Sequence, residues 1–452
     1  MAMYKAYPDY KDSGIEWLGD IPEGWTVSKV KYLAPFQVGW TPPTKNDANF
    51  IGDNLWVNIS DLKDKFISST AKFISDKAAK EASMDITPKG SLLYSFKLSV
   101  GAVSFAGCDL YTNEAIASFL SHAQLPLSYL YYALPIFIIE NASTNIYGAK
   151  ILNQELIKNS FLLAPPHGEA EKVANFLDHE TAKIDNLIEK QQQLIELLKE
   201  KRQAVISHAV TKGLNPDAPM KDSGVEWLGE VPNHWRVSRI KNFAKIESGH
   251  TPSKTKEEYW VDCNIPWVSL NDSKQLKNID YIDDTFYKIS KLGMANSSAH
   301  LLPARAVVFT RDASIGLSAI TTKPMAVSQH LIAWVCDEEF IVPEFLLLVF
   351  YAMEKEFERY TFGATLKTIG MDNVRSLACS FPPVKEQYEI ISWAFGKLES
   401  IKASLNKVEN IITLLQERRT ALISAAVTGK IDVRDWVAPD TQDVEEPQEA
   451  TA

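Results

Sequence analysis

Residues 11–31 read KDSGIEWLGDIPEGWTVSKVK, and residues 221–241 read KDSGVEWLGEVPNHWRVSRIK. These two stretches, the opening blocks, are 210 positions apart and identical at 13 of 21 positions. Solenoid repeats recur every ~20–50 residues, so this much larger offset indicates that a whole domain has been duplicated. We therefore expect the two halves of the chain to share a fold and to carry related functions.

A second pair of related stretches, the closing blocks, ends each half. LLKEKRQAVISHAVT at 197–211 matches LLQERRTALISAAVT at 414–428 at 10 of 15 positions, with an offset of 217. The middles of the halves are divergent, and their short β-rich and helical runs predict an α/β or α+β fold. They keep a common skeleton, in which GWTPP (39–43) matches GHTPS (249–253), LWVNISD (55–61) matches PWVSLND (266–272), and PKGSLLYSFKLSVG (88–101) matches PARAVVFTRDASIG (303–316).

Each closing block lies in a long predicted helix. Prolines at 165–166 and 382–383 mark the helix starts, and no proline follows for about forty residues. A helix over residues 169–210 would be about 63 Å long at ~1.5 Å per residue, which is more than one globular core can cover. Apolar residues recur at heptad spacing in both helices, namely Ile184, Leu187, Leu194, Leu198 and Val205 in the first, and Ile401, Leu405, Val408, Ile411, Leu415 and Leu422 in the second.

We expect the two helices to pair with each other. The alternative is that each helix packs only on its own domain, but both are too long for that and their lengths and patterns match. Similar halves imply a pseudo-two-fold axis and hence an antiparallel coiled coil. The same symmetry predicts that residue 428 lies near Lys11, because residue 211 lies just before Lys221.

The composition is that of a globular protein with more than one domain. The chain has 452 residues, of which 46% are hydrophobic, and a net charge of −10. Residues 431–452 carry seven carboxylates against Arg434, so −6 of the total charge lies in this acidic tail, which is expected to be disordered. The remaining −4 leaves room for basic clusters elsewhere on the chain.

Several classes of protein are disfavoured by what the sequence lacks. No apolar stretch has the ~20 residues that cross a bilayer and the start has no signal-peptide pattern, so a cytoplasmic protein is expected. The four cysteines have no CxxC spacing and suggest neither zinc nor disulfides. No GxxxxGK[ST], GxGxxG, HExxH or [DN]PP[YFW] motif is present. These absences favour a binding protein over an enzyme, with no catalytic residue, metal or cofactor of its own.

Small polar and basic residues gather in the predicted loops of the two middles. Any one of them could be an ordinary solvated residue, but the loops are where the halves diverge, as two readers of different sequences would. Arg and Lys can pair with guanine, Asn with adenine, and Lys or Ser with phosphates. The candidates for DNA contact are Lys45, Asn46, Asn58, Ser60, Lys63, Lys65, Ser95, Lys97, Lys150, Ser253, Lys254, Lys256, Ser269, Asn271, Lys274, Arg311, Ser314 and Lys367.

The chain as a whole resembles the specificity (S) subunit of type I restriction-modification systems. Matching segments cover nearly the whole chain in the family's order. The first half departs from the family's pattern with TPP at 41–43 and APPHGEAEKV at 164–173. The features that carry the resemblance are KDSGxEWLGxxPxxW in both opening blocks, TPS at 251–253, SIG at 314–316, FGAT at 362–365, FPPVKEQYEII at 381–391 and ERRTALISAAVTGKIDV at 417–433.

The resemblance implies two similar globular target-recognition domains separated by the family's two long conserved helices, which form a pseudo-two-fold symmetric antiparallel coiled coil. Each domain would read one half of a bipartite site in double-stranded DNA, and the helices would set the spacer. Catalysis would belong to partners: two modification subunits that methylate adenine N6 with S-adenosylmethionine, and two restriction subunits that use ATP and Mg²⁺. The implied domains are 1–165 and 223–382 for target recognition, 166–212 and 383–430 for the helices, 213–222 for a linker and 431–452 for the tail.

Two other functions compete with this interpretation. The chain could be a coiled-coil scaffold that presents two protein-binding modules, but the opening and closing blocks argue against it. It could also be an enzyme fused to its own reader, which would require a methylase or nuclease motif that the sequence lacks.

Overall fold

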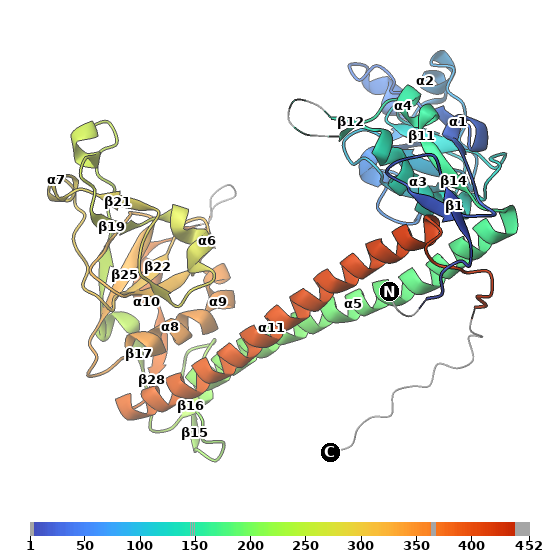
Figure 1. Ribbon diagram of the computed structural model, residues 1–452. Helices are drawn as coiled ribbons and strands as arrows, with labels where there is room; N and C mark the ends of the chain where they lie inside the picture. Colours follow the sequence, from blue (N-terminus) through green and yellow to red (C-terminus); the bar gives the residue numbers. More distant parts are fainter. Residues whose placement is uncertain (1–3, 145, 147, 149, 363–367, 439–452) are drawn as a thin grey trace. The chain divides into compact units, whose positions relative to one another are not determined.

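Figure 1 shows the computed structural model, which describes residues 4–144, 146, 148, 150–362 and 368–438. The chain divides into two compact units: unit 1 holds Met1–Lys190 with Ile411–Ala452, and unit 2 holds Gln191–Asn410. Each unit contains one globular domain and part of each of two long helices, α5 (His167–Lys212) and α11 (Val384–Val427). Within the described ranges, no helix is both long and apolar enough to cross a membrane.

The globular domain of unit 1 has a five-stranded sheet of order β4-β11-β8-β9-β6 and a three-stranded sheet of order β10-β5-β7. Strands β8 and β11 are buried throughout, which explains their apolar runs without alternation. The elements are β1 (Tyr10–Asp12), β2 (Asp20–Pro22), β3 (Thr26–Lys29), α1 (Val30–Leu33), β4 (Phe36–Val38), η1 (Asp47–Phe50), β5 (Asn54–Val57), η2 (Ile59–Asp61), β6 (Phe66–Ile67), β7 (Phe73–Ile74), α2 (Asp76–Glu81), β8 (Leu92–Ser95), β9 (Val103–Ala106), β10 (Tyr111–Thr112), β11 (Ile116–Phe119), α3 (Leu127–Phe137), η3 (Ile138–Asn141), β12 (Ser143–Thr144), β13 (Lys150–Ile151), α4 (Gln154–Asn159) and β14 (Phe161–Ala164).

The globular domain of unit 2 repeats this topology with sheets of order β18-β25-β22-β23-β20 and β21-β19-β24. The expected duplication and the mixed α/β class are therefore confirmed. The elements are β15 (Met220–Asp222), β16 (Glu230–Pro232), β17 (Arg236–Arg239), η4 (Ile240–Asn242), β18 (Ala244–Ser248), η5 (Glu257–Trp260), β19 (Ile265–Val268), η6 (Leu270–Asp272), α6 (Ser273–Leu276), β20 (Tyr281–Ile282), β21 (Tyr287–Ile289), α7 (Lys291–Ala295), β22 (Val307–Thr310), β23 (Ser318–Thr321), β24 (Ala326–Val327), β25 (Leu331–Cys336), α8 (Pro343–Ala352), α9 (Glu354–Arg359), β26 (Thr361–Phe362), β27 (Thr368–Ile369), α10 (Met371–Ser376) and β28 (Ala378–Phe381).

Each globular domain is closed by an antiparallel ladder between the third strand of its unit and the last strand before the long helix that follows. In unit 1, β3 pairs with β14, and in unit 2, β17 pairs with β28. The chain leaves both ladders at equivalent points, since Val30 donates to the Ser160 carbonyl and Ile240 donates to the Leu377 carbonyl, both at 2.9 Å. The segment between the ladder strands is thus a self-contained insert on the helical frame.

The two long helices lie side by side within each unit (Figure 1). In unit 1, Ile184 near the start of α5 shares a core with Leu422 near the end of α11, and Arg419 donates to the Asp185 carboxylate at 2.8 Å. In unit 2 the relation is reversed, because Ile206 near the end of α5 shares a core with Ile390 near the start of α11. The helices are therefore antiparallel, as expected.

The seam between the helices differs from the predicted one at three positions. Leu187, Leu194 and Ile411 are 46%, 38% and 42% exposed. Each of the three is followed directly by a second apolar residue, so a heptad step of either three or four residues fits the sequence. In the structure the second residue of each pair is half-buried, and the predicted one is exposed. The predicted seam residues that are buried or half-buried are Ile184, Leu198, Val205, Ile401, Leu405, Val408, Leu415 and Leu422.

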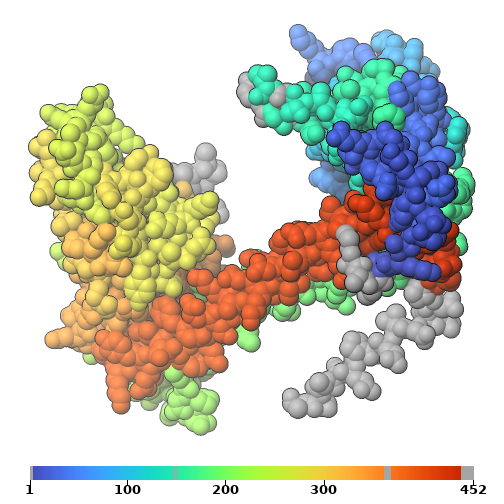
Figure 2. Space-filling model, viewed as in Figure 1, coloured from blue at the N-terminus to red at the C-terminus, as the bar shows by residue number. Residues whose placement is uncertain are grey.

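In unit 1, a carboxylate at the start of α5 anchors the opening block. The Trp25 indole is buried and donates from Nε1 to Glu169 Oε1 at 2.8 Å. Gly429, just after α11, has a φ of +72°, and a Cβ there would lie 2.4 Å from Pro22 Cδ. The Tyr10 hydroxyl donates to the Gly429 carbonyl at 3.0 Å, which confirms that this end of the chain lies beside the opening block (Figure 2).

Unit 2 contains the equivalent junction. Trp235 Nε1 donates to Glu386 Oε1 at 3.0 Å at the start of α11. Gly213, just after α5, has a φ of +73°, and a Cβ there would lie 2.9 Å from the Trp235 ring. The repeated blocks are thus explained, because the opening block supplies the tryptophan and the closing block leads into the glycine.

The C-terminal segment is folded further than predicted. The sequence predicts a disordered tail from residue 431, but Ile431 and Val433 are 5% and 1% exposed, and Trp436 packs edge-on against Phe176. These apolar side chains alternate with charged ones, so the net charge of the segment concealed its packing. The acidic stretch 439–452 lies outside the described residues.

Two glycine substitutions test the junction of unit 1. Gly429→Ala is expected to lower the free energy of unfolding by about 1–3 kcal/mol, because alanine is strained at positive φ and its Cβ would overlap Pro22. Gly396→Ala is the control, since a Cβ at this exposed position within α11 meets nothing within 4 Å and should stabilise the helix by ~0.5–1 kcal/mol. Urea-unfolding midpoints measure both effects, and equal midpoints would contradict the packing described.

Candidate functional site

Three loops lie together beside the three-stranded sheet of each globular domain, and in unit 2 they line a pocket. These two sets of loops are called the first cleft in unit 1 and the second cleft in unit 2. The first loop of each passes close to a strand end: a Cβ on Gly39 would lie 1.8 Å from the Thr112 carbonyl oxygen, and one on Gly249 would lie 1.9 Å from the Val327 carbonyl oxygen. Only glycine permits this approach, which explains the shared first residue of GWTPP and GHTPS.

The first loop contains GWTPP (39–43) in unit 1 and GHTPS (249–253) in unit 2. A tryptophan of the central strand of the three-stranded sheet, β5 or β19, holds this loop in place. Trp56 Nε1 donates to the Trp40 carbonyl at 3.0 Å, and Trp267 Nε1 donates to the His250 carbonyl at 3.2 Å. Both indoles are buried, so the carbonyl groups satisfy donors that would otherwise lose their hydrogen bonds. The backbone of this loop is therefore the same in the two units although its side chains differ.

The second loop begins where the same strand ends. Asn58 in unit 1 and Ser269 in unit 2 each start a 3-10 turn closed by a capping box. Their backbone amides donate to the carboxylates of Asp61 and Asp272, both at 2.8 Å. Reciprocal capping fixes the turn and leaves its outer side chains free to vary.

The third loop follows β10 in unit 1 and β24 in unit 2, the strands that pair parallel with the central strand. Glu114 in this loop accepts a hydrogen bond from the Thr41 hydroxyl, and Gln329 accepts one from the Thr251 hydroxyl. The third residue of GWT and GHT thus ties the first loop to the third. The two clefts share this bond but present a carboxylate in one case and a carboxamide in the other.

The first cleft pairs opposite charges. The Lys97 ammonium lies 4.0 Å from Glu114 Oε1. Burial alone would raise the pKa of the Glu114 carboxyl, but the hydrogen bond from Thr41 and the charge of Lys97 lower it, and the net pKa lies below its ordinary value. Glu114 is therefore ionised at neutral pH and can only accept hydrogen bonds.

The second cleft instead contains a chain of hydrogen bonds that starts from a buried carboxylate. Asp312, which is 6% exposed, lies with Oδ2 2.7 Å from His330 Nδ1 and also accepts from the Thr368 hydroxyl. His330 Nε2 lies 3.1 Å from Gln329 Nε2. The chain continues through Gln329 to Thr251, so one buried charge orients three side chains of the cleft.

The second cleft encloses a pocket of about 640 Å³. The Ser328 hydroxyl near this pocket is buried and has no hydrogen-bond partner among the described residues. The side chains that line the pocket are Thr251, Lys254, Trp260, Trp267, Ser269, Leu270, Asn271, Tyr287, Ser328, Gln329 and His330.

Many of the candidate contact residues lie on these loops. Lys254, Ser269 and Asn271 line the pocket of the second cleft, while Asn58 and Lys97 contact residues of the third loop in the first cleft. The others on the first and second loops or just beyond them are Lys45, Asn46, Ser60, Lys63, Ser253, Lys256 and Lys274. Lys150 is exposed on β13, Ser314 lies on the loop after β22, and Lys367 lies outside the described residues.

Three candidates are engaged inside the fold instead. Ser95 is fully buried at the end of β8, because the pleat of this central strand turns its side chain inward. The Lys65 ammonium lies 2.7 Å from Asp178 of α5. Arg311 has a buried Nε that lies 3.6 Å from Asp312. The structure thus gives Lys65 and Arg311 partners within the protein, and it corrects the prediction that Ser95 is available for contact.

The sequence comparison of the halves missed the third loop. Glu114, Gln329 and His330 were not among the candidates because TNEA at 112–115 and VSQH at 327–330 share no residue. Their equivalence follows from the strand pairing, in which Val57 is opposite Thr112 and Val268 is opposite Val327. Aligning the predicted strands of the two halves, instead of their residues, could have found them.

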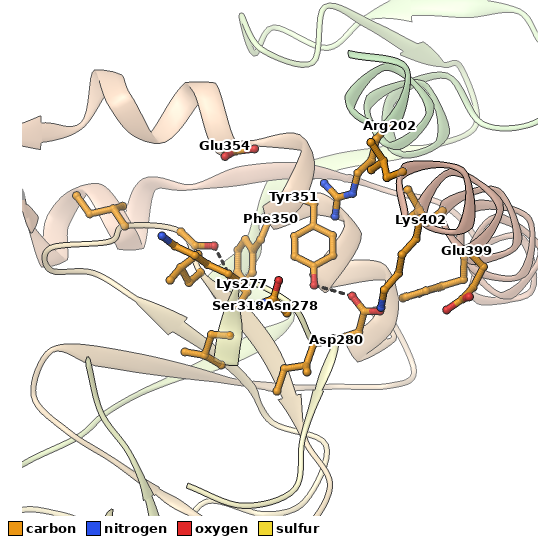
Figure 3. A pocket seen from close by; sticks show the side chains of 18 residues that line it. Arg202, Lys277, Asn278, Asp280, Ser318, Phe350, Tyr351, Glu354, Glu399 and Lys402 are labelled. Carbon is orange, nitrogen blue, oxygen red and sulfur yellow. Dashed lines mark hydrogen bonds between the residues drawn. The ribbon is translucent and has the colours of Figure 1, made fainter. Parts of the chain in front are cut away.

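A second pocket of unit 2, of about 650 Å³, lies where the globular domain meets α5 and α11 (Figure 3). Its Tyr351 hydroxyl donates to Asp280 at 2.8 Å, and the Arg202 guanidinium lies 5.3 Å from the Tyr351 ring centre. Burial and the Asp280 carboxylate raise the pKa of the Tyr351 phenol, which therefore stays protonated as the donor. These contacts hold the globular domain on the helices, and we assign the pocket to this junction.

The comparison with known families finds one match that covers most of the chain. The model described as "Type I restriction modification DNA specificity domain" matches residues 22–197 and again residues 232–412. Each match spans one globular domain and part of one long helix. The double match follows the duplication described above.

Individual relatives agree with this match. The chain is 24% identical to the type I restriction enzyme MjaIX specificity subunit of Methanocaldococcus jannaschii, over 96% of this chain and 99% of that one. It is 27% identical to the HindI specificity subunit of Haemophilus influenzae, over 44% and 42% of the two chains.

Solved structures share the fold. One is a chain from a structure described as showing complex assembly and conformational transition of the type I R-M system, with a TM-score of 0.70 at 15% identity over 91% of this chain and 99% of that one. Another is the HsdS subunit from Thermoanaerobacter tengcongensis, with a TM-score of 0.53 at 14% identity over 91% and 98% of the chains. At these identities the likeness concerns the fold alone.

Proposed function

The chain belongs to the type I restriction modification DNA specificity family, and from this premise we propose that units 1 and 2 each read one half of a bipartite DNA site. One observation carries the proposal. The two clefts are built on the same backbone, held by the same glycine, tryptophan, threonine and capping contacts, yet their facing side chains differ. Such a pair is suited to reading two different sequences with one scaffold.

As a specificity subunit, the chain recognises DNA and is not the catalytic component. Its partners are DNA and the modification and restriction subunits, and we propose two copies of each subunit per chain. S-adenosylmethionine would then be bound by the modification subunits, and ATP with Mg²⁺ by the restriction subunits. A cytoplasmic location stays a prediction.

Electrostatics favours recognition within an assembled complex. The chain carries a net charge of −10, so its loop lysines must supply phosphate contacts against an unfavourable total. Each phosphate contact releases bound cations, and the affinity for DNA should therefore fall steeply with salt. Basic surfaces of partner subunits would add to the few contacts that this chain offers.

The antiparallel helices would set the spacer between the half-sites. α5 and α11 contain 46 and 44 residues, and each is a continuous helix. A helix rises ~1.5 Å per residue and cannot stretch, whereas DNA repeats every ~34 Å. Two globular domains fixed to such a frame would require one spacer length between their half-sites and one relative rotation of the half-sites around the DNA axis.

The exposed faces of the same helices offer docking sites for the modification subunits. Leu197 on α5 and Leu414 on α11 are equivalent members of the closing blocks and are 60% and 62% exposed. We infer that a partner covers both positions, because the two leucines are exposed to the same extent at equivalent places in the duplicated helices. One such surface in each unit would account for two modification subunits.

The function is tested by the DNA methylation pattern. The chain is expressed with its modification subunit in a host without other adenine methylases, and methylated adenines are mapped by sequencing. We expect one asymmetric motif with two specified halves and an unspecified spacer. A coiled-coil scaffold for protein partners, the competing function, would give no such motif, and its absence would contradict the proposal.

Deleting one heptad from both helices tests the spacer. Removal of residues 188–194 together with 405–411 should shorten the frame by about 10 Å, and the spacer by about three base pairs, at ~1.5 Å per residue and ~3.4 Å per base pair. The two specified halves of the motif should be unchanged. Exchanging these two heptads without deletion is the control and should keep the original spacer. The same spacer in both variants would refute this role of the helices.

Charge substitutions test the docking sites. Leu197→Asp and Leu414→Asp should each weaken binding of one modification subunit by about 10-fold to 100-fold, since a leucine contributes ~1.5–3 kcal/mol on burial. Native mass spectrometry counts the subunits bound. The control is Gln192→Asp, which adds the same charge about 140° around α5 from Leu197. Full assembly of the double Leu197→Asp, Leu414→Asp variant would contradict the assignment.

A further inference from the structure

We propose that Gln329 and Glu114 are the equivalent specificity-determining residues of the two clefts, Gln329 reading adenine and Glu114 reading cytosine. The inference rests on the proposed function and adds to it the base that each unit recognises at one position. Both residues lie in the third loop of their cleft.

The equivalence of the two positions is fixed by the backbone. Glu114 and Gln329 each lie two residues beyond a strand that pairs parallel with the central strand. In both loops the residue before them donates its amide to that central strand, Asn113 to the Val57 carbonyl at 3.0 Å and Ser328 to the Val268 carbonyl at 2.9 Å. Each side chain is then held by the threonine of the first loop. The carboxylate of Glu114 and the carboxamide of Gln329 therefore occupy the same place, and the two clefts offer a ligand different hydrogen-bonding groups there.

The orientation of the Gln329 carboxamide is determined by its neighbours. Asp312 Oδ2 lies 2.7 Å from His330 Nδ1 and holds the ring in place. The other ring nitrogen, Nε2, lies 3.1 Å from Gln329 Nε2, so the amide nitrogen of Gln329 faces the ring. The amide oxygen faces the Thr251 hydroxyl, which donates to it. His330 and Asp312 are positioning residues for Gln329.

This arrangement leaves Gln329 with the groups that adenine requires. A carboxamide has two N–H donors and two oxygen lone pairs, and one of each is used by His330 and Thr251. The remaining donor and acceptor can pair with adenine, which presents N7 as acceptor and N6 as donor in the major groove. Guanine presents acceptors at both N7 and O6, so it cannot satisfy the free oxygen of Gln329.

Glu114 presents a different pattern. Its carboxylate only accepts hydrogen bonds, and it is held by Thr41 on one side with Lys97 at 4.0 Å on the other. Cytosine presents the N4 amino donor in the major groove and is the usual partner of a carboxylate there. Guanine at the same position would bring its acceptors against the negative charge.

The surroundings of Gln329 suit a base edge better than solvent. The second cleft encloses about 640 Å³, and its wall contains the indoles of Trp260 and Trp267. A base edge in this pocket would therefore meet apolar indole surface beside the polar carboxamide of Gln329.

Exchanging the two side chains tests the assignment. The complex of the full chain with its modification subunits is incubated with duplexes randomised in one half-site at a time, and bound duplexes are sequenced. Gln329→Glu should change the preference at one position of one half-site from adenine to cytosine. Glu114→Gln should change one position of the other half-site from cytosine to adenine. The expected change in preference is about 10-fold to 100-fold, the usual discrimination of one good base contact.

His330→Ala tests the positioning role. Without the ring the carboxamide can turn over, so discrimination should fall far more at the position read by Gln329 than at the other positions of the half-site. A merely structural role of His330 would lower recognition across the whole half-site. Thermal unfolding of each variant shows whether the fold is kept.

The outcomes separate this inference from the proposed function. If the unaltered complex selects no bipartite sequence, the proposed function fails. If it selects one and both exchanges leave every position as before, the assignment of Gln329 and Glu114 is wrong. An exchange that abolishes selection at all positions of its half-site would also overturn it, because the residue would then support the loop and not one base.

Discussion

In each unit, a carboxylate at the start of one long helix holds the indole of an opening block, and a glycine after the other long helix packs beside that indole. The Nε1–Oε1 distances are 2.8 Å for Trp25 with Glu169 and 3.0 Å for Trp235 with Glu386. Because the carboxylate and the glycine come from opposite ends of the two helices, this contact fixes their antiparallel direction. It also seats the opening block, from which each globular domain begins.

The two clefts, like the two junctions, are held by equivalent contacts in the two units. Their backbone is fixed by contacts that tolerate little change, such as the close approach of Gly39 to Thr112 and of Gly249 to Val327. Glu114 and Gln329 both accept the hydrogen bond of the first-loop threonine, so the residue at this position can change from a carboxylate to a carboxamide while the contact between the loops is kept. A protein built in this way can acquire a new sequence preference by changing a few loop residues while the frame stays constant.

Much of the frame could be predicted from the sequence, because its signals are local. Pro166 and Gly213 mark the ends of α5 to within a residue. The seam could not be predicted where two apolar residues are adjacent, as in Leu187-Ile188, because the packing of the partner helix decides which of the two is buried. The C-terminal packing of Ile431 and Val433 was concealed by the acidic residues around them.

The clefts could be predicted only in part. Asn58 and Ser269 follow a recognisable strand and tryptophan, and the sequence comparison located them. Glu114 and Gln329 follow strands of unlike sequence, and their place is set by parallel pairing with residues more than fifty positions away. Lys65 was predicted to contact DNA, but its ammonium binds Asp178. That partner lies 113 positions along the chain, and no local pattern in the sequence indicates the contact.

If the two units are equivalent readers on one frame, a chimaeric chain with the same recognition segment in both units must read the same half-site twice. Residues 240–377 are replaced by a second copy of residues 30–160, with the junctions placed at the equivalent ends of the β3–β14 and β17–β28 ladders. Methylated adenines are then mapped in cells that contain the chimaera and its modification subunit. We expect a motif with two identical, inverted halves around the original spacer. An asymmetric motif would contradict it, as would the loss of all methylation by a chimaera that still assembles with its modification subunits.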